Sequence, residues 1–267
     1  MSPSNKITFG TYRIKTLDDI YNGLDIALSN GIRYFDTAEL YKNHHLIGLV
    51  LNNLLDKYNI TRKDIKITTK ISFKTLTLSN EDIIKSIDKI FDDLQIDYLD
   101  TLLIHAPTND DNNKRIWSIL CNYTNKIIYN IGVSNFRYEH IKSLNEYINI
   151  NQLTKIYINQ IELNPFVFSR QKQLIEYCKE NDILISLYGL FYHLDKYIDI
   201  LPNNISIKRN HLIKWSLFHN FIPNIKTLNK EILDEILCDS DNTYNDYLDN
   251  IEFNAITGFQ YTKYNTN

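Results

Sequence analysis

The sequence predicts an α/β fold, a single (β/α)8 TIM barrel, and three observations support this class. Short apolar runs alternate with amphipathic segments eight times along the 267 residues. The apolar runs are continuous rather than alternating in polarity, as expected for parallel strands that are covered by helices. No linker, low-complexity tract or change of composition divides the chain, and about 250 residues is a usual size for such a barrel. We therefore expect residues 1–267 to form one barrel domain rather than an open doubly wound sheet.

The strands and helices can be assigned in order along the chain. The expected strands lie near residues 7–12, 32–36, 65–70, 99–105, 127–133, 156–162, 183–188 and 220–225. The amphipathic segments that we expect to form helices lie near 16–30, 43–58, 79–94, 113–122, 137–149, 169–180, 207–219 and 229–238. Helix start signals occur at Ser79, which precedes Glu81 and Asp82, and at Ser169. The stretch 239–250, rich in Asp and Asn, is expected to be at most a loop.

Composition excludes several classes of function. The net charge of −3 gives no basic surface for nucleic acid, and no apolar run is long enough to cross a bilayer. The N-terminus lacks the basic and apolar regions of a signal peptide. Cys121, Cys178 and Cys238 have neither metal-like spacing nor an even number for disulfides, which favours a reducing compartment. We expect a cytoplasmic protein without nucleic-acid or membrane partners, and a monomer by default.

Familiar cofactor and metal motifs are missing from the sequence. There is no Gly-x-Gly-x-x-Gly and no P-loop, so a Rossmann or nucleoside-triphosphatase reading fails. His-Glu-x-x-His and Cys-x-x-Cys are absent too. His44-His45 is the nearest approach to a metal pair, but adjacent side chains diverge on a helix and nothing nearby supplies further ligands. We interpret this pair as an exposed helix start and expect no metal site.

Polar residues gather at the C-terminal ends of the expected strands, where the active sites of barrels assemble. Strand interiors are otherwise apolar or aromatic. A barrel with a purely structural role would not need polar groups at one rim, so this pattern points to an enzyme. The polar groups, one for each of strands two to eight, are Asp36, Lys70, His105, Ser134-Asn135, Gln160 with Glu162, Tyr188 and Lys226.

Tyr41, soon after Asp36, adds a phenol to this set. A phenol is a poor acid near neutral pH, because its unperturbed pKa is about 10. A cationic Lys70 would favour the phenolate of Tyr41, and Asp36 would keep Lys70 charged and oriented. His105 would donate a hydrogen bond to a carbonyl oxygen. Such a site prepares a carbonyl carbon for hydride attack, and the hydride must come from a cofactor because no side chain supplies one.

Five blocks of sequence resemble the aldo-keto reductases, barrel enzymes that bind NAD(P)H without a Rossmann fold. The resemblance runs from Phe9 to about Glu231. Any one block can arise by chance, whereas five in order at the family's spacing form a specific signal. The blocks are Gly31-Ile-Arg-Tyr-Phe-Asp-Thr-Ala-Glu-Leu-Tyr41, Lys70 at a strand end, Ile104-His-Ala-Pro107, Ile131-Gly-Val-Ser-Asn-Phe136 and Asn159-Gln-Ile-Glu-Leu-Asn-Pro165.

The resemblance implies roles for individual residues. Asp36, Tyr41, Lys70 and His105 fall on the catalytic tetrad, with Tyr41 as general acid. Ser134, Asn135 and Gln160 fall on residues that bind the nicotinamide carboxamide, Tyr188 on the residue that stacks on its ring, and Lys226 and Thr227 on the pair that contacts the 2′-phosphate of NADP. The implied cofactor is NADPH, with NADH possible, and the substrate a small carbonyl compound. Taken alone, Ser134-Asn135 would be read as a helix N-cap and Tyr188 as barrel packing.

The sequence departs from the family pattern at three places. His44 stands where the family usually has a glutamate, and Tyr188-Gly189-Leu190 where it usually reads Tyr-Ser-Pro-Leu. Ile232 stands where an arginine usually follows Lys226, although Lys230 lies close by in the sequence. A lysine lacks the guanidinium fork, so it would replace that arginine only in part.

Alternatives to an active reductase remain at this stage. The chain can be a cofactor-binding regulatory barrel with little turnover, as the potassium-channel β subunits of this family suggest. A barrel lyase or isomerase would need a phosphate or metal site that the sequence does not offer. Substrate specificity is expected from residues 108–114, from 191–206 and from the tail 244–267, with Phe9, Tyr12 and Phe73 as possible apolar lining.

Overall fold

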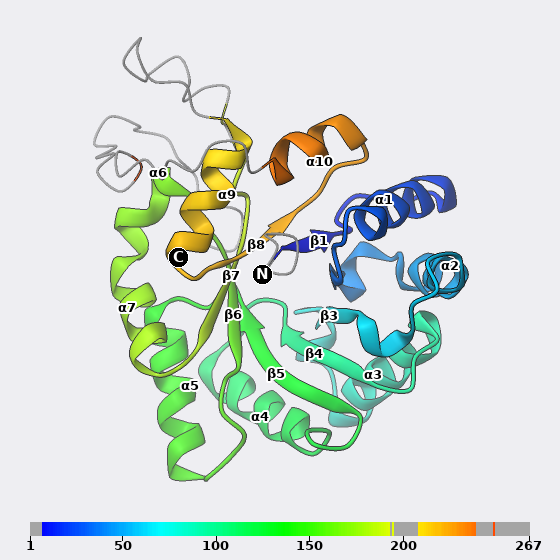
Figure 1. Ribbon diagram of the computed structural model, residues 1–267. Helices are drawn as coiled ribbons and strands as arrows, with labels where there is room; N and C mark the ends of the chain where they lie inside the picture. Colours follow the sequence, from blue (N-terminus) through cyan, green and yellow to red (C-terminus); the bar gives the residue numbers. More distant parts are fainter. Residues whose placement is uncertain (1–6, 193, 195–207, 239–247, 249–267) are drawn as a thin grey trace.

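Eight parallel strands close into a barrel in the part of the chain that the computed structural model describes, residues 7–192, 194, 208–238 and 248 (Figure 1). Each strand pairs with the next one, and β8 pairs with β1 to close the ring. The predicted TIM barrel is therefore confirmed. The strands are β1 Thr8–Gly10, β2 Tyr34–Asp36, β3 Lys66–Ile71, β4 Leu99–Ile104, β5 Ile128–Ser134, β6 Ile158–Glu162, β7 Leu184–Tyr188 and β8 Ile222–Ile225.

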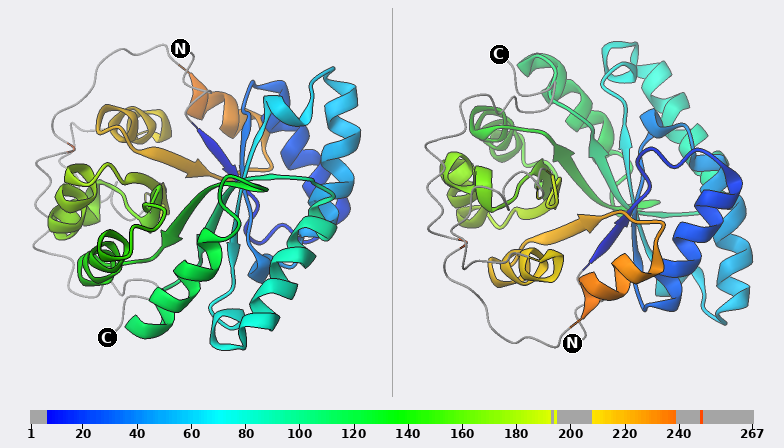
Figure 2. Two further views of the ribbon diagram at one scale, coloured as in Figure 1. Left: turned by 90° about the horizontal axis from the view of Figure 1, so that it is seen from below. Right: turned by 90° about the horizontal axis from the view of Figure 1, so that it is seen from above.

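Helices surround the barrel on its outside (Figure 2). Their apolar faces pack on the strands and form one continuous core, with Trp117 and Trp215 among the fully buried side chains. The helices are α1 Leu17–Ser29, α2 His44–Lys57, α3 Asn80–Leu94, α4 Asp110–Cys121, α5 Tyr138–Ile150, α6 Pro165–Phe168, α7 Lys172–Glu180, α9 Arg209–Phe218 and α10 Lys230–Leu237.

Local sequence explains where these helices begin. Ser79 caps α3 by accepting a hydrogen bond from the backbone N–H of Asp82 at 3.2 Å, a contact worth about 1 kcal/mol. The residues Ile83, Ile87, Ile90 and Leu94 follow at helical spacing and are all buried, so one stripe of α3 packs on the barrel. Capping by a polar residue and a single apolar stripe together define this helix.

Two predicted helices differ from the structure. The helix expected near 113–122 begins at Asp110, because the side chain of Asn109 accepts a hydrogen bond from Asn112 N and caps it. The segment expected near 169–180 is broken: α6 starts at Pro165 after the cap Asn164, and α7 starts at Lys172. Proline at the first position of a helix has a favourable φ and needs no hydrogen-bond donor, so the chain enters a helix earlier than the pattern indicated.

Strand register brings the predicted polar residues to one end of the barrel. Gly10 is level with Asp36, Ser134 with Gln160, and Glu162 with Tyr188. Strands β5 and β6 approach each other closely at Gly132. A Cβ atom at this position would lie 2.5 Å from the carbonyl oxygen of Ile158. The glycine of the block Ile131–Phe136 is thus required by packing.

Candidate active site

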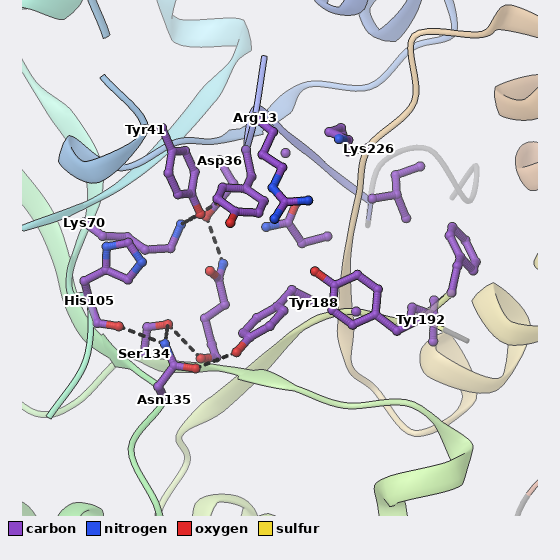
Figure 3. A pocket seen from close by; sticks show the side chains of 18 residues that line it. Arg13, Asp36, Tyr41, Lys70, His105, Ser134, Asn135, Tyr188, Tyr192 and Lys226 are labelled. Atoms are coloured by element: carbon purple, nitrogen blue, oxygen red, sulfur yellow. Dashed lines mark hydrogen bonds and ion pairs between the residues drawn. The ribbon is translucent and has the colours of Figure 1, made fainter. Parts of the chain in front are cut away.

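A cavity of about 390 Å³ opens at the C-terminal ends of the strands (Figure 3). Every polar residue assigned to catalysis or cofactor binding lines it except Thr227. The sequence-based expectation that these groups converge is therefore supported by their positions. The converging residues are Asp36, Tyr41, Lys70, His105, Ser134, Asn135, Gln160, Tyr188 and Lys226.

Lys70 is the centre of a buried cluster at the base of the cavity. Its ammonium Nζ lies 2.6 Å from Asp36 Oδ1 and 2.9 Å from the carbonyl oxygen of Thr37. It also donates to the hydroxyl oxygen of Tyr41 at 3.4 Å. Asp36 ends β2, Lys70 lies in β3, and Tyr41 ends the short 3-10 helix η2, Glu39–Tyr41. Because the ammonium donates to the phenol oxygen, the phenolic proton of Tyr41 can point into the cavity.

Burial controls the proton equilibria of this cluster. It raises the pKa of Tyr41 well above its usual value, and the Asp36 carboxylate raises it further. Burial also lowers the pKa of Lys70, while Asp36 opposes that change. The net shift of the Tyr41 pKa is thus opposite to the one we expected from Lys70. Desolvation of the phenolate outweighs the nearby cation, so Tyr41 holds its proton firmly at neutral pH.

His105 follows β4 and lies beside the phenol. The two rings are 6.0 Å apart between centroids and meet edge to face at 82°. Burial, followed by the charge of Lys70, lowers the pKa of His105 to about 3. Its buried Nδ1 has no hydrogen-bond partner among the residues that the structure describes. His105 is therefore a neutral imidazole that can donate one N–H bond, and not a proton source at neutral pH.

Amide and hydroxyl groups form a second cluster next to His105. Asn135 donates from Nδ2 to the His105 carbonyl oxygen at 2.9 Å and to Ser134 Oγ at 3.1 Å. Its Oδ1 accepts a hydrogen bond of 2.7 Å from the Tyr188 hydroxyl. Asn135 has a left-handed backbone conformation with φ of 62°, which asparagine tolerates better than most residues. Helix α5 begins only at Tyr138, so the helix-cap interpretation of Ser134-Asn135 is wrong.

Gln160 connects the two clusters. Its side-chain Nε2 donates to Asp36 Oδ2 at 2.8 Å, while its backbone oxygen accepts from Ser134 Oγ at 2.9 Å. The Asp36 carboxylate is thus held by Lys70 on one oxygen and Gln160 on the other. A buried carboxylate with both oxygens bonded is fixed in orientation, and so is the lysine paired with it.

The wall near β1 contains a residue that the sequence analysis did not find. Tyr12 lines the cavity as expected, with its ring 5.1 Å from that of Tyr41. Arg13 lines it too (Figure 3). The Arg13 guanidinium lies over the Tyr12 ring, 5.2 Å from its centroid. The barrel rule applied to the loop after the first strand would have identified Arg13. Phe9 and Phe73 are not part of the lining; Phe9 is fully buried in the core.

Comparisons with known proteins identify the family of this chain. Residues 6–231 match the model of the aldo/keto reductase family. The chain belongs to this family. An uncharacterized oxidoreductase of Schizosaccharomyces pombe is 30% identical over 236 residues, covering 85% of this chain and 79% of the relative. The glyoxal reductase of Bacillus subtilis is 27% identical over 225 residues, covering 82% and 77%.

Solved structures of aldo/keto reductases have the same barrel. The enzyme of Brucella melitensis superposes with a TM-score of 0.76 at 25% identity, over 92% of both chains. The Bombyx mori aldo-keto reductase, solved in complex with NADP, has a TM-score of 0.75 at 19% identity, over 92% of this chain and 87% of that one. At 19% identity, the similarity to the Bombyx mori structure is evidence for the fold and not for a shared function.

The segment assigned to the 2′-phosphate differs between its two residues. Lys226 lines the cavity, is exposed, and forms no ion pair with any residue that the structure describes. The hydroxyl of Thr227 instead bonds to the backbone of Asn229, accepting from its N–H at 3.0 Å. Lys230, considered a partial substitute for the family arginine, pairs with Asp234 at 2.7 Å. Of these three side chains, that of Lys226 lines the cavity, whereas those of Thr227 and Lys230 bond to their own segment.

The histidine at the family's glutamate position is not an exposed helix start. His44 is 5% exposed, and its Nε2 forms a 2.8 Å hydrogen bond with Thr69 Oγ1. Burial lowers the pKa of His44 to about 4. The prediction of exposure was wrong because His44 belongs to the buried stripe of α2 with Ile47 and Leu51. Its neighbour His45 is exposed, as expected.

The remaining sequence expectations concern loops, metals and membranes. Gly189 follows Tyr188 with φ of 72°, a conformation suited to glycine, and Leu190 lines the cavity. Of the expected specificity segments, residues 193, 195–206, 244–247 and 249–267 lie outside the described residues. In the described part of the chain no cluster of three metal-binding side chains occurs, and no described helix is both long and apolar enough to span a bilayer.

Proposed function

We propose that this chain reduces aldehydes or ketones to alcohols with NADPH, with Tyr41 as the general acid. One observation carries the proposal: the Tyr41 hydroxyl, the Lys70 ammonium and the Asp36 carboxylate form a buried chain of contacts, at 3.4 and 2.6 Å, beside neutral His105. Membership of the aldo/keto reductase family supports carbonyl chemistry at this site. NADH remains a possible second cofactor.

The proposed roles follow from the protonation states. Tyr41 donates its proton to the carbonyl oxygen as negative charge develops there, and the Lys70 ammonium then stabilises the phenolate. Asp36 keeps Lys70 charged in a buried position. His105 donates a hydrogen bond to the same carbonyl oxygen. A raised phenol pKa suits this order of events, since the proton stays on Tyr41 until the oxyanion forms.

The lining of the cavity suits a dinucleotide. Ser134, Asn135 and Gln160 offer the amide and hydroxyl groups that a carboxamide needs, and the ring of Tyr188 lies beside them. Lys226 offers a cation without an ion-pair partner among the described residues, to which a 2′-phosphate can bind. A bound nicotinamide would supply the hydride. Thr227 would be a ligand only if its hydroxyl exchanged its bond to Asn229.

Turnover tests the proposal directly. Purified protein is mixed with NADPH or NADH and a panel of aldehydes and ketones, and loss of the reduced cofactor is followed by near-ultraviolet absorbance. Glyoxal belongs in the panel because the Bacillus subtilis relative is named a glyoxal reductase. The matched variant is Tyr41→Phe, which keeps the ring and removes the proton. We expect kcat to fall by at least about 100-fold, with cofactor affinity changed less than about twofold.

Two outcomes would contradict the proposal. Full activity in Tyr41→Phe would show that another group provides the proton. Absence of turnover in the wild type, with cofactor binding still detected by fluorescence, would favour the regulatory alternative.

A further inference from the structure

Glu39 lies two residues before Tyr41, in the same 3-10 helix η2, and its carboxylate makes three contacts with another part of the chain. Glu39 Oε2 accepts a 2.7 Å hydrogen bond from the backbone N–H of Ser72. Its Oε1 accepts from Thr75 Oγ1 at 2.7 Å and from Ser86 Oγ at 3.0 Å. The donors lie in the connection between β3 and α3 and in α3 itself. Both carboxylate oxygens are therefore committed to one neighbouring segment.

The placement of these contacts relates them to the catalytic pair. Ser72 comes two residues after Lys70, just as Tyr41 comes two residues after Glu39. The bond from Ser72 N to Glu39 and the longer contact of 3.4 Å between Lys70 Nζ and the Tyr41 hydroxyl therefore both connect η2 to the end of β3. Hydrogen bonds to a carboxylate are shorter and about twice as strong as neutral ones. The Ser72–Glu39 hydrogen bond, at 2.7 Å, is shorter than the Lys70–Tyr41 contact, at 3.4 Å.

Glu39 is the first residue of the short helix that carries Tyr41, and its carboxylate ties that end of the helix to the segment after β3, while Asn43, two residues after Tyr41, is held separately by bonds from its side chain to the carbonyl oxygens of Thr11 and Ile14. The helix contains three residues and ends at Tyr41, and the next residue, Lys42, has a left-handed backbone with φ of 58°. Within it, the Tyr41 N–H bonds to the Ala38 carbonyl oxygen at 2.9 Å. A shift of about 1 Å at a reacting group can cost about 100-fold in rate, so contacts that tie the turn of Tyr41 to the segment after Lys70 bear on catalysis.

We propose that Glu39 is a positioning residue that sets the distance between the Tyr41 hydroxyl and Lys70. The role rests on the proposed reductase function. Glu39 holds the tyrosine's turn against the segment that follows Lys70, so the phenol stays within reach of the ammonium. His44, at the position where the family usually has a glutamate, is directed to Thr69 instead, and Glu39 supplies the carboxylate that fixes this region.

The experiment compares Glu39→Gln with a matched control. Glutamine keeps the length of the side chain and loses the charge and one acceptor oxygen. Asp25→Asn is the control, because Asp25 likewise accepts short bonds from two side chains, Lys57 at 2.7 Å and Tyr58 at 2.9 Å, between α1 and α2. We expect kcat of Glu39→Gln to fall at least about tenfold while KM and cofactor affinity change less than about twofold. Asp25→Asn should keep kcat within about twofold.

A second comparison separates positioning from general destabilisation. In the Tyr41→Phe background, Glu39→Gln should cause no further loss of kcat, because the group that it positions is already gone. Additive losses, or equal losses in Glu39→Gln and Asp25→Asn, would overturn the positioning role. So would wild-type kcat in Glu39→Gln. A wild-type protein without turnover would instead overturn the reductase function. The experiment therefore distinguishes failure of the positioning role from failure of the reductase function.

Discussion

Acidification should destabilise this barrel through His44, and the size of the effect follows from its burial. His44 is 5% exposed and its pKa is lowered from 6.5 to about 4 by burial. In the unfolded chain it would take up a proton near pH 6.5, whereas the folded protein resists protonation until about pH 4. The unfolded state therefore binds more protons between these values. Stability from this group is fully present above pH 6.5 and is lost as the pH falls toward 4.

The magnitude can be worked out from the two pKa values. At about 1.4 kcal/mol for each pKa unit, the full loss from His44 is about 3 kcal/mol. At pH 5 the unfolded histidine is nearly all protonated and the folded one nearly all neutral, and the loss is about 2 kcal/mol. His105, with a pKa of about 3, adds a comparable loss over the same range. A variant that lacks only His44 separates the two contributions.

His44→Gln is that variant, because an amide does not titrate and can still hydrogen-bond Thr69. The free energy of unfolding is measured in urea at pH 7.5 and 5, with the fluorescence of the buried Trp117 and Trp215 as the signal. The wild type should lose about 2 kcal/mol more than His44→Gln between the two pH values. His45→Gln, a change at the exposed neighbour, should behave as the wild type does. Equal losses in wild type and His44→Gln would refute the linkage argument.

Two further substitutions test the charge assignments. Lys226→Ala should weaken NADPH about tenfold more than NADH in fluorescence titrations, since it removes a cation that only the 2′-phosphate would use; equal weakening would remove that role. Asp100→Asn should lower the free energy of unfolding in urea by about 2 to 3 kcal/mol, because buried Asp100 pairs with Arg62 at 2.7 Å and Lys66 at 3.1 Å. The exposed pair Lys230–Asp234 is the control, and Asp234→Asn should cost less than about 0.5 kcal/mol. A similar cost for both aspartates would contradict the burial argument.

The barrel could be predicted because its signals are repeated and local. Each continuous apolar run was long enough to mark a strand, and β3 and β4 lie within one residue of their expected ends. The predicted helix boundaries were wrong where a single residue starts a helix earlier than the apolar pattern indicates. Pro165 starts a helix before the expected segment, and Asn109 caps α4 earlier than the apolar pattern showed. Capping and proline act at single positions, so periodicity does not reveal them.

The site was predictable where residues close a strand and less so where a loop sets the geometry. Asp36, Lys70 and His105 line the cavity because parallel strands end at the same rim. Thr227 lies only one residue beyond Lys226, yet its hydroxyl bonds to the turn before α10. Whether a loop side chain faces a cavity or its own backbone depends on turn geometry that spacing does not specify. The link from Glu39 to Ser72 spans 33 positions and has no sequence signature.

The charges in the cavity restrict which residue can deliver a proton. His105, with a pKa of about 3, carries no spare proton near neutral pH. Lys70 and Asp36 form a buried ion pair at 2.6 Å, and moving a proton out of that pair would leave an uncompensated charge in a desolvated place. Tyr41 keeps its proton because its pKa is raised, and its hydroxyl contacts the Lys70 ammonium, which can stabilise the resulting phenolate. Among these four residues, the proposed reaction therefore requires Tyr41 as the acid and leaves His105 to orient the carbonyl oxygen.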